Sequence, residues 1–244
     1  MYLYIFMSQA GTVSNATIKR LARDVKEIMK NPLEENGIYY MHSDSDMLRG
    51  QALIIGPTDT PYAYGYYYFD IVFPTNYPQS PPVFTYDTND GMTRFNPNLY
   101  KNGKVCISVL NTWRGDQWSP CQTISSILLS VCTVLNDKPL LNEPGIKESD
   151  PDFLNYNKII TYKNFSVGIV EMLESKYIKG KYPALFDVSH QLFLKNYEEI
   201  KKLLDTHQDS GINVITTRIY GMQTMVDYKK IKESMNKLYN QIKN

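Results

Sequence analysis

Cys106 is the residue whose setting in this sequence most clearly suggests chemistry. It lies in the short apolar run Val105 to Ile107, just after a tight turn at Asn102-Gly103. Backbone amides and side-chain donors crowd around a residue placed in this way, and a cysteine sulfur is a soft nucleophile and a good leaving group. The alternative is that Cys106 is buried as a small hydrophobic residue, which is common for free cysteines. The residues on either side decide between the two interpretations.

A second turn, Asn96-Pro97-Asn98, precedes Cys106, and Trp118-Ser119-Pro120 follows it. Because proline lacks a backbone donor and fixes its φ, this turn continues neither a helix nor a central strand. The arrangement resembles the active-site region of ubiquitin-conjugating enzymes (E2), in which a His-Pro-Asn or Asn-Pro-Asn turn precedes the catalytic cysteine and Trp-Ser-Pro follows it. The resemblance implies that Cys106 accepts ubiquitin, or a ubiquitin-like modifier, as a thioester from an activating enzyme. It then transfers the modifier to a lysine of a substrate protein or to a ubiquitin ligase.

Three further features place the resemblance in the large-enzyme branch of the family. They are the asparagine at the head of the turn, the insert Asn-Thr-Trp-Arg-Gly between Cys106 and Trp118, and the run Asn142 to Gly145. The branch contains the Z-type and O-type enzymes and the giant conjugating protein called BRUCE or Apollon. The C-terminal region most resembles the tail of the Z-type enzyme.

Asn98 has two compatible interpretations. In the family the matching asparagine donates to the carbonyl oxygen that becomes negatively charged when the amine attacks the thioester. The alternative is that its side chain ties down its own turn, as asparagines commonly do. Asn96 stands where the family usually has a mainly structural histidine. The attacking lysine must also lose a proton, and Asn142 and Glu143 occupy the region where many family members place an assisting residue; the sequence leaves the choice between them open.

Other classes of function are less well supported. A papain-like hydrolase needs a histidine base and an orienting Asn or Asp, but His190 and His207 lie beyond a predicted boundary near Gly180 and Cys106 lacks the flanking signature of those enzymes. A catalytically inactive ubiquitin-binding adaptor on the same fold is the stronger alternative. Variants of that kind lack the cysteine, whereas this sequence keeps Cys106 and its turn.

Composition excludes several partners. The 244 residues carry a net charge of +1 with a pI near 7.6, so no nucleic-acid partner is expected. The three cysteines and three histidines form neither a CxxC nor an HxxxH pair, so no metal site is expected. The resemblance implies no bound cofactor, with ATP used by the upstream activating enzyme.

The longest apolar run, Ile124 to Leu135, is too short to span a membrane. A sparse, odd number of cysteines favours a reducing compartment, the cytoplasm or the nucleus.

The first half of the chain predicts a helix followed by an antiparallel meander. Apolar residues recur at helical spacing from Ala16 to Met29. Its exposed side is expected to carry Lys19, Arg20 and Arg23, either as a solvated face or, as the resemblance implies, as a surface that binds the activating enzyme. Strands are predicted at Ile38 to Tyr40, Leu48 to Ile55, Tyr64 to Val72 and from Val83.

Two loops carry the residues that the resemblance assigns to ligase binding. The segment Phe73 to Pro82 is dense in proline and is interpreted as a stiff connector, because a strand resumes at once after it. The family implies that Phe73 and Pro78 in this loop, with Ser119 and Pro120 in a second loop, form the surface offered to ubiquitin ligases.

The second half of the chain is predicted to be helical. Helical patterns cover Gln122 to Leu135, Pro151 to Tyr177, Val188 to Leu204 and Tyr228 to Ile242. In the first of these, Cys132 lies on the face that is expected to pack into the core. The last two helices are expected to pack on each other and on the main domain, the alternative being a partner-binding arm. The segment Lys179 to Pro183, which contains a glycine and a proline, is the clearest candidate for a domain boundary. We therefore predict three parts: a leader at 1–14, for which a flexible conformation is one expectation, a catalytic domain at 15–180 and a helical extension at 181–244. The expected fold is the α+β ubiquitin-conjugating (UBC) fold, which has an N-terminal helix, a four-stranded antiparallel meander sheet and C-terminal helices.

Overall fold

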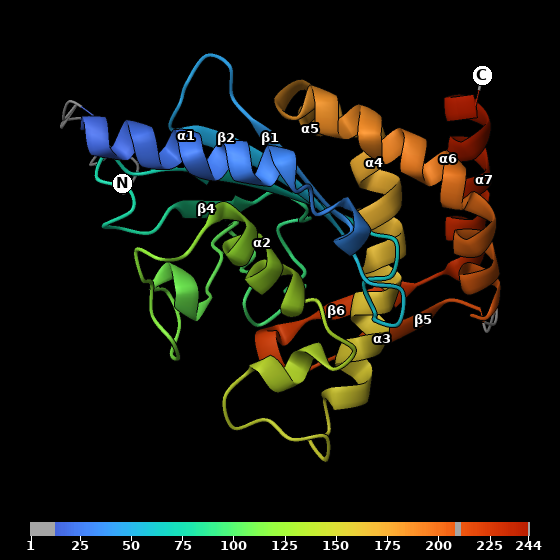
Figure 1. Ribbon diagram of the computed structural model, residues 1–244. Helices are drawn as coiled ribbons and strands as arrows, with labels where there is room; N and C mark the ends of the chain where they lie inside the picture. The colour runs from blue at the N-terminus through green and yellow to red at the C-terminus, as the bar shows by residue number, and fades with distance from the viewer. Residues whose placement is uncertain (1–12, 208–210, 244) are drawn as a thin grey trace, which may run out of the picture.

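The computed structural model describes residues 13–207 and 211–243, so most of the predicted leader, residues 1–12, lies outside the described part. The helices are α1 (Asn15–Lys30), α2 (Ile124–Thr133), α3 (Phe153–Lys163), α4 (Met172–Glu174), α5 (Lys176–Lys181), α6 (Pro183–Asp205) and α7 (Tyr228–Lys243). The strands are β1 (Ile38–His42), β2 (Arg49–Ile55), β3 (Tyr66–Val72), β4 (Val83–Tyr86), β5 (Asn213–Thr216) and β6 (Gln223–Val226). Their order along the chain is shown by colour in Figure 1.

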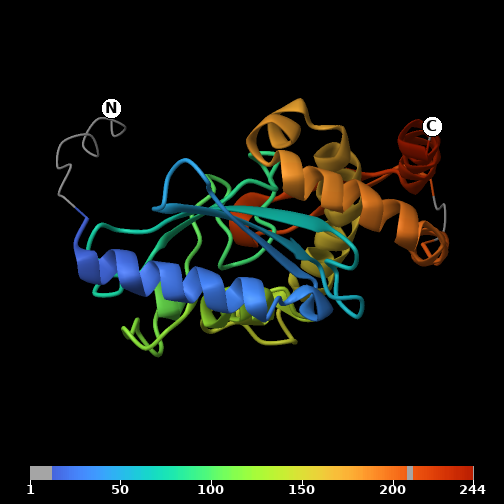
Figure 2. The same ribbon diagram turned by 45° about the horizontal axis from the view of Figure 1, so that its top comes forward.

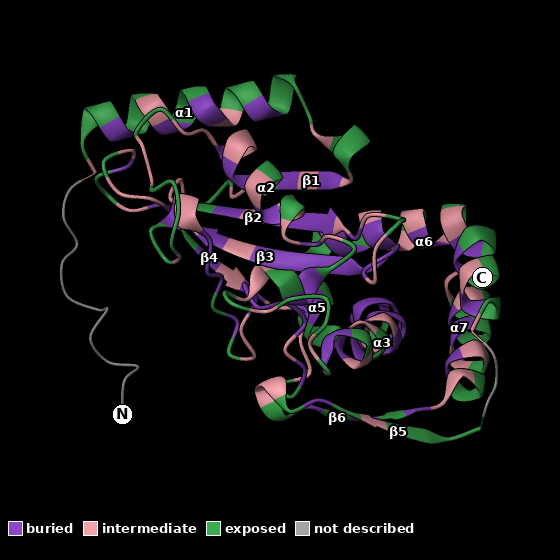
Figure 3. Ribbon diagram, turned by 90° about the horizontal axis from the view of Figure 1, so that it is seen from below, coloured by how far each residue is buried: buried purple, intermediate pink, exposed green. Residues whose placement is uncertain are grey.

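Helix α1 forms where the spacing of apolar residues predicts it. The Ser14 hydroxyl accepts a hydrogen bond from the Thr17 amide at 3.1 Å, which caps the first turn. Leu21 and Ile28 are buried on the side that faces the sheet, together with Asp24. Figure 3 shows α1 lying along one face of the sheet. The predicted N-terminal helix is confirmed.

The sheet is a simple antiparallel meander in the order β1-β2-β3-β4. Strand β3 is its centre, and four consecutive residues, Tyr66 to Phe69, are buried. Consecutive strand residues point to opposite faces, so burial of all four means that both faces are covered. Helix α3 and the segment that follows it lie beyond the face opposite α1 (Figure 3). The fold class expected from the resemblance, an α+β UBC fold with a four-stranded meander, is confirmed.

Buried tyrosines tie the sheet to the helices on its far side. The Tyr67 hydroxyl donates to Asn164 Oδ1 at 2.7 Å, and Asn164 begins a π-helical segment, Asn164–Glu171. The Tyr68 hydroxyl donates to Ser189 of α6 at 2.8 Å. Each phenol is therefore satisfied inside the core.

Helix α2 begins two residues later than the periodicity predicts. Thr123 is its N-cap: its side chain accepts from the Ser126 amide, and the Ser126 hydroxyl accepts from the Thr123 amide. This capping box fixes the start of the helix. Cys132 is half-buried and packs against the core, as its place in the pattern predicts.

The C-terminal extension is integrated with the rest of the molecule. The predicted boundary, Lys179 to Pro183, spans the end of α5 and the start of α6, and Tyr182 within it is fully buried. The carbonyl of Lys181 accepts from Gln51 of β2 at 2.7 Å. Helix α6 packs against β1, α4 and α7, and Figures 1 and 2 place α6 and α7 at the end of the molecule remote from the start of α1. The two terminal helices therefore dock, while the exact domain limits stay a prediction.

The extension also contains a hairpin that the sequence did not predict. Strands β5 and β6 pair antiparallel, from Asn213 with Val226 to Thr216 with Gln223. The hairpin lies across α3 (Figures 1 and 3). Its turn, Ile219–Gly221, is held to the start of α3 by a 2.7 Å hydrogen bond from the Ile219 amide to Asp152 Oδ2.

Candidate active site

Cys106 and Asn98 are held together by two hydrogen bonds. The Cys106 amide donates to the Asn98 carbonyl at 2.8 Å, and Asn98 Nδ2 donates to the Cys106 carbonyl at 2.6 Å. The neighbouring residues Leu99 and Val105 form an antiparallel bridge. The chain thus folds back on itself between the turn and the cysteine, which explains their spacing of eight positions. Cys106 is 1% exposed and Asn98 5% exposed.

Asn96 organises the turn from within the core. Its Nδ2 donates to the Tyr62 hydroxyl at 2.9 Å and to the Val134 carbonyl at 2.6 Å, while its Oδ1 accepts from the Asn98 amide at 2.9 Å. Asn96 is fully buried. Its role is therefore structural, and it fixes the backbone that carries Asn98.

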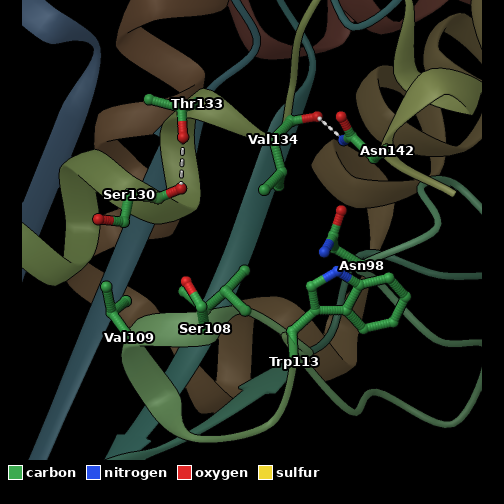
Figure 4. Close-up of a pocket in the computed structure, with 9 residues that line it drawn as sticks. Asn98, Ser108, Val109, Trp113, Ser130, Thr133, Val134 and Asn142 are labelled. Atoms are coloured by element: carbon green, nitrogen blue, oxygen red, sulfur yellow. Dashed lines mark hydrogen bonds between the residues drawn. The ribbon is translucent and has the colours of Figure 1, made fainter. Parts of the chain in front are cut away.

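A pocket of about 350 Å³ opens beside Asn98. Its wall is formed by the loop after Cys106, the second half of α2 and the loop that follows it. The lining residues are Asn98, Ile107, Ser108, Val109, Trp113, Ser130, Thr133, Val134 and Asn142. Figure 4 shows Asn98 between Asn142 and the ring of Trp113. Within the described part of the chain, Asn98 Oδ1 is buried without a hydrogen-bond partner. The pocket is polar on the side of these amides and apolar at Trp113.

The structure shows that the side chains of Asn142 and Glu143 lie in different surroundings, which the sequence alone did not reveal. Asn142 lines the pocket and donates to the Val134 carbonyl at 3.1 Å (Figure 4). Glu143 instead accepts a hydrogen bond from the Tyr220 hydroxyl of the C-terminal hairpin. Burial, followed by this bond to Glu143, raises the pKa of Tyr220. Asn142, a neutral amide, is therefore the member of the pair placed at the pocket.

The two predicted ligase-binding loops lie side by side. Trp118 Nε1 donates to the Pro78 carbonyl at 2.8 Å, which links the loop of Ser119 and Pro120 to the proline-dense loop. Phe73 differs from the prediction of a surface residue, since it is only 2% exposed and packs edge-on against Tyr77. It supports the loop from beneath, because its position at the end of β3 points it into the core. Ligase binding by Pro78, Ser119 and Pro120 stays a prediction.

The basic residues of α1 do not form one exposed face. Lys19 is exposed and the side chain of Arg23 is 72% exposed, as predicted, but that of Arg20 is only 13% exposed. Arg20 Nε lies 2.8 Å from the carboxylate of buried Asp24, and the guanidinium also donates to the Pro120 and Gln122 carbonyls. The prediction that Arg20 lies on the exposed side of the helix is wrong, because buried Asp24 and the loop carbonyls draw its guanidinium inward.

Other kinds of site receive no support from the described part of the chain. Residues 13–207 and 211–243 contain no group of three or more His, Cys, Asp or Glu side chains that could hold a metal ion. Over the same residues, no helix combines the length and the apolar character needed to cross a bilayer. Cys121 is exposed and Cys132 half-buried, and none of the three cysteines is among the lining residues; Cys106 adjoins the pocket through its hydrogen bond with Asn98.

Comparison with known proteins identifies the class. The family model described as "Ubiquitin-conjugating enzyme" matches residues 20–163. This match covers more than half of the chain and includes the turn, Cys106 and α2, so the chain belongs to the ubiquitin-conjugating enzyme (E2) family.

The similar proteins belong to the branch that the active-site turn indicated. The chain is 42% identical over 166 residues to ubiquitin-conjugating enzyme E2 Z of Xenopus tropicalis, covering 67% of this chain and 52% of that protein. It is 40% identical to the human E2 Z protein, covering 73% and 50%. It is 41% identical to the human dual E2 ubiquitin-conjugating enzyme/E3 ubiquitin-protein ligase BIRC6, covering 60% of this chain and 3% of that protein. The chain thus spans about half the length of the E2 Z proteins it matches.

A solved structure of human ubiquitin-conjugating enzyme E2 G1 is also similar. It is 36% identical in sequence, with a TM-score of 0.44, and the match covers 51% of this chain and 98% of that chain.

Sequence reasoning missed several residues around the site. Trp113 was noted only as part of an insert, although a large apolar ring seven residues after Cys106 was a usable signal. Arg94 and Tyr220 were not singled out. Arg94 directly precedes the turn region, but nothing in the local sequence around Tyr220 shows that it folds back to position 143.

Proposed function

We propose that this protein is a ubiquitin-conjugating enzyme that carries ubiquitin, or a ubiquitin-like modifier, as a thioester on Cys106. The observation that carries the proposal is the pairing of Cys106 with Asn98, which lines the pocket, in a chain of this family. Its partners would be the modifier, a ubiquitin-activating enzyme that consumes ATP, a ubiquitin ligase and a substrate protein. We place it in the cytoplasm or the nucleus, where three unpaired cysteines remain reduced.

Two acyl transfers make up the proposed reaction. In the first, Cys106 Sγ attacks the thioester carbonyl on the activating enzyme, a new C–S bond forms, and the cysteine thiolate of the activating enzyme leaves. In the second, a lysine amine attacks the Cys106 thioester, a C–N bond forms, and the Cys106 thiolate leaves while the amine loses a proton. Because the thioester is already activated, a thiolate leaving group suffices. Cys106 is 1% exposed, so attack requires a local opening around it.

Asn98 would stabilise the second step. Amine attack places negative charge on the thioester oxygen, and a neutral amide donor stabilises that charge without becoming charged. In the resting structure Asn98 Nδ2 donates to the Cys106 carbonyl. The amide is therefore already next to the reacting residue, and redirecting it needs only a local change. Asn142, on the same polar side of the pocket as Asn98, would orient the incoming amine (Figure 4).

Thioester formation tests the proposal. Wild-type protein incubated with activating enzyme, ATP and ubiquitin should form an adduct that thiol reductant cleaves. Cys106→Ser should form an oxyester that survives reductant. Cys121→Ala and Cys132→Ala are matched controls and should charge normally, because neither cysteine belongs to the hydrogen-bonded pair with Asn98.

Two outcomes would contradict the proposal. A reductant-sensitive adduct that persists in Cys106→Ala would show that another residue carries the acyl group. Failure of the wild-type protein to charge with ubiquitin and with ubiquitin-like modifiers, combined with measurable ubiquitin binding, would favour the inactive adaptor.

A further inference from the structure

The turn of the C-terminal hairpin reaches the active-site turn, although more than a hundred residues separate them in the sequence. Tyr220, at the tip of this hairpin, contacts two segments that contribute to the candidate site: the residues just before the active-site turn and the loop that carries Asn142. On one side its ring lies against Arg94, and on the other its hydroxyl donates to Glu143, next to Asn142. Figure 1 shows the hairpin extending from the C-terminal helices past α3 towards the middle part of the chain.

Arg94 connects this tip to the backbone of the active-site turn. Its guanidinium carbon lies 3.3 Å from the ring centre of Tyr100 and 5.0 Å from that of Tyr220. From this position Nε donates to the Asn96 carbonyl at 3.1 Å and Nη2 to the Pro97 carbonyl at 2.7 Å. A planar guanidinium stacks on aromatic rings and donates in fixed directions, which a lysine ammonium cannot do. The two carbonyls that it holds directly precede Asn98.

The backbone on either side of Arg94 is fixed as well. Its amide donates to Met222 Sδ at 3.3 Å, and its carbonyl accepts from the Tyr156 hydroxyl at 2.7 Å. Met222 follows Tyr220 by two residues and is 4% exposed. The hairpin therefore holds both the main chain and the side chain of Arg94.

The tip itself is rigidly placed. Asp152 accepts from the Ile219 amide at 2.7 Å, and Asn155 donates to the Thr216 carbonyl at 3.2 Å, which fixes the hairpin on α3. Tyr220 has φ of 60°, a left-handed conformation that residues other than glycine rarely adopt. Such a conformation persists only where the surrounding structure holds it, and it is found preferentially at functional sites.

We propose that Tyr220 and Arg94 are positioning residues for Asn98, through which the C-terminal extension sets the geometry of lysine attack. Tyr220 holds the guanidinium of Arg94, and Arg94 holds the carbonyls of Asn96 and Pro97. Asn98 follows these carbonyls, so its amide is kept at the thioester. This inference rests on the proposed conjugating activity and adds a role for the extension in it.

The test compares five variants of the whole chain in single-turnover discharge of the preformed thioester to free lysine. Tyr220→Ala removes the ring, and Arg94→Lys keeps the charge but removes the stacking and the paired donation. Each should slow discharge at saturating lysine by about tenfold, the scale expected from misplacing a catalytic group by a fraction of an ångström. The KM for lysine and the rate of charging at Cys106 should stay unchanged. Met225→Ala, on the same hairpin but 62% exposed, is the matched control and should behave as wild type.

The double variant Tyr220→Ala/Arg94→Lys tests whether the two residues act through one route. If they do, it should discharge no more slowly than the slower single variant, because the second change removes a contact already lost. If the loss of rate in the double variant equals the product of the losses in the two single variants, the two residues act independently and the shared route is overturned. Tyr220→Phe keeps the ring and loses only the bond to Glu143, so it should discharge close to the wild-type rate; a rate as low as that of Tyr220→Ala would overturn positioning through Arg94.

Failure of this inference can be distinguished from failure of the proposed function. If the wild-type protein forms no thioester, the conjugating activity itself is wrong. If the wild type charges and discharges and a folded Tyr220→Ala does both at the same rates, the positioning role is wrong while the activity stands. If Tyr220→Ala loses charging and discharge to the same extent and has a lower melting temperature, Tyr220 only stabilises the fold, and the inference is also overturned.

Discussion

Replacing Asn98 with alanine tests whether Asn98 has the proposed catalytic role or only a structural one. Asn98→Ala removes the 2.6 Å hydrogen bond to the Cys106 carbonyl and leaves that buried acceptor unpaired. A loss of this kind costs about 1–3 kcal/mol of stability. For a chain of this size each kcal/mol lowers the melting temperature by roughly 2–4 °C. We therefore expect the uncharged variant to melt a few degrees below the wild type and to remain folded at 25 °C.

The catalytic effect of the same change should be larger and confined to one step. Loss of one oxyanion donor costs about 3 kcal/mol, or on the order of a hundredfold or more in rate. Charging at Cys106 should be nearly normal, while discharge of the preformed thioester to lysine should fall by that factor. Asn98→Asp should be at least as slow, because an ionised carboxylate donates no hydrogen bond and faces the developing negative charge.

Asn96→Ala provides the matched comparison. Asn96 is fully buried and donates to Tyr62 and Val134, so its loss should destabilise the turn at least as much as the loss of Asn98. It does not line the pocket, and we expect it to slow charging and discharge in parallel. A normal discharge rate in well-folded Asn98→Ala would refute the catalytic role, and parallel losses like those of Asn96→Ala would leave Asn98 a structural residue.

Two further predictions concern charge. Arg20→Ala should destabilise the protein by about 2–3 kcal/mol in chemical denaturation, because it removes the close cation of the buried Asp24 carboxylate and leaves only exposed Arg23, whose Nε lies 3.9 Å away. Lys19→Ala, at an exposed position, should change stability by less than about 0.5 kcal/mol, and an equal loss for the two variants would contradict the structural role of Arg20. Burial, reinforced by nearby Lys232, lowers the pKa of His207, so the unfolded chain takes up the proton first as the pH falls below about 6.5 and stability falls with it. His207→Gln should reduce the difference between urea midpoints measured at pH 7.5 and pH 5.5; an unchanged difference would show that His207 does not contribute.

The features that could be predicted from the sequence are those set by local pattern. The spacing of apolar residues located α1, and β-branched and aromatic runs located β1 to β4. The turn and Cys106 were found because residues close in sequence carry the family resemblance. These features depend on interactions over a few residues or on a motif that is read directly.

The features that could not be predicted depend on contacts between distant segments. Strands β5 and β6 are four residues each; β5 is largely exposed, and β6 buries Thr224 while exposing Met225, so neither shows the apolar and polar alternation that marks a half-buried strand in sequence. Arg20 looked exposed on the helix, but its partners at positions 120 and 122 lie a hundred residues away. The different positions of Asn142, at the pocket, and Glu143, bonded to Tyr220, also depend on the folded hairpin, which brings Tyr220 to that loop.

The asparagine at the head of the turn has a physical rationale in this network. Asn96 donates two hydrogen bonds, to Tyr62 and Val134, and accepts two more, from Asn98 and from Asn142 at 3.3 Å. A neutral imidazole offers one donor and one acceptor, so the histidine usual at this position in the family could not make all four. A histidine is also a titratable group, whereas a primary amide keeps the same donors and acceptors throughout the neutral pH range. With Asn98 and Asn142, Asn96 therefore forms an uncharged set of amides that fixes the pocket without a group that titrates near neutral pH.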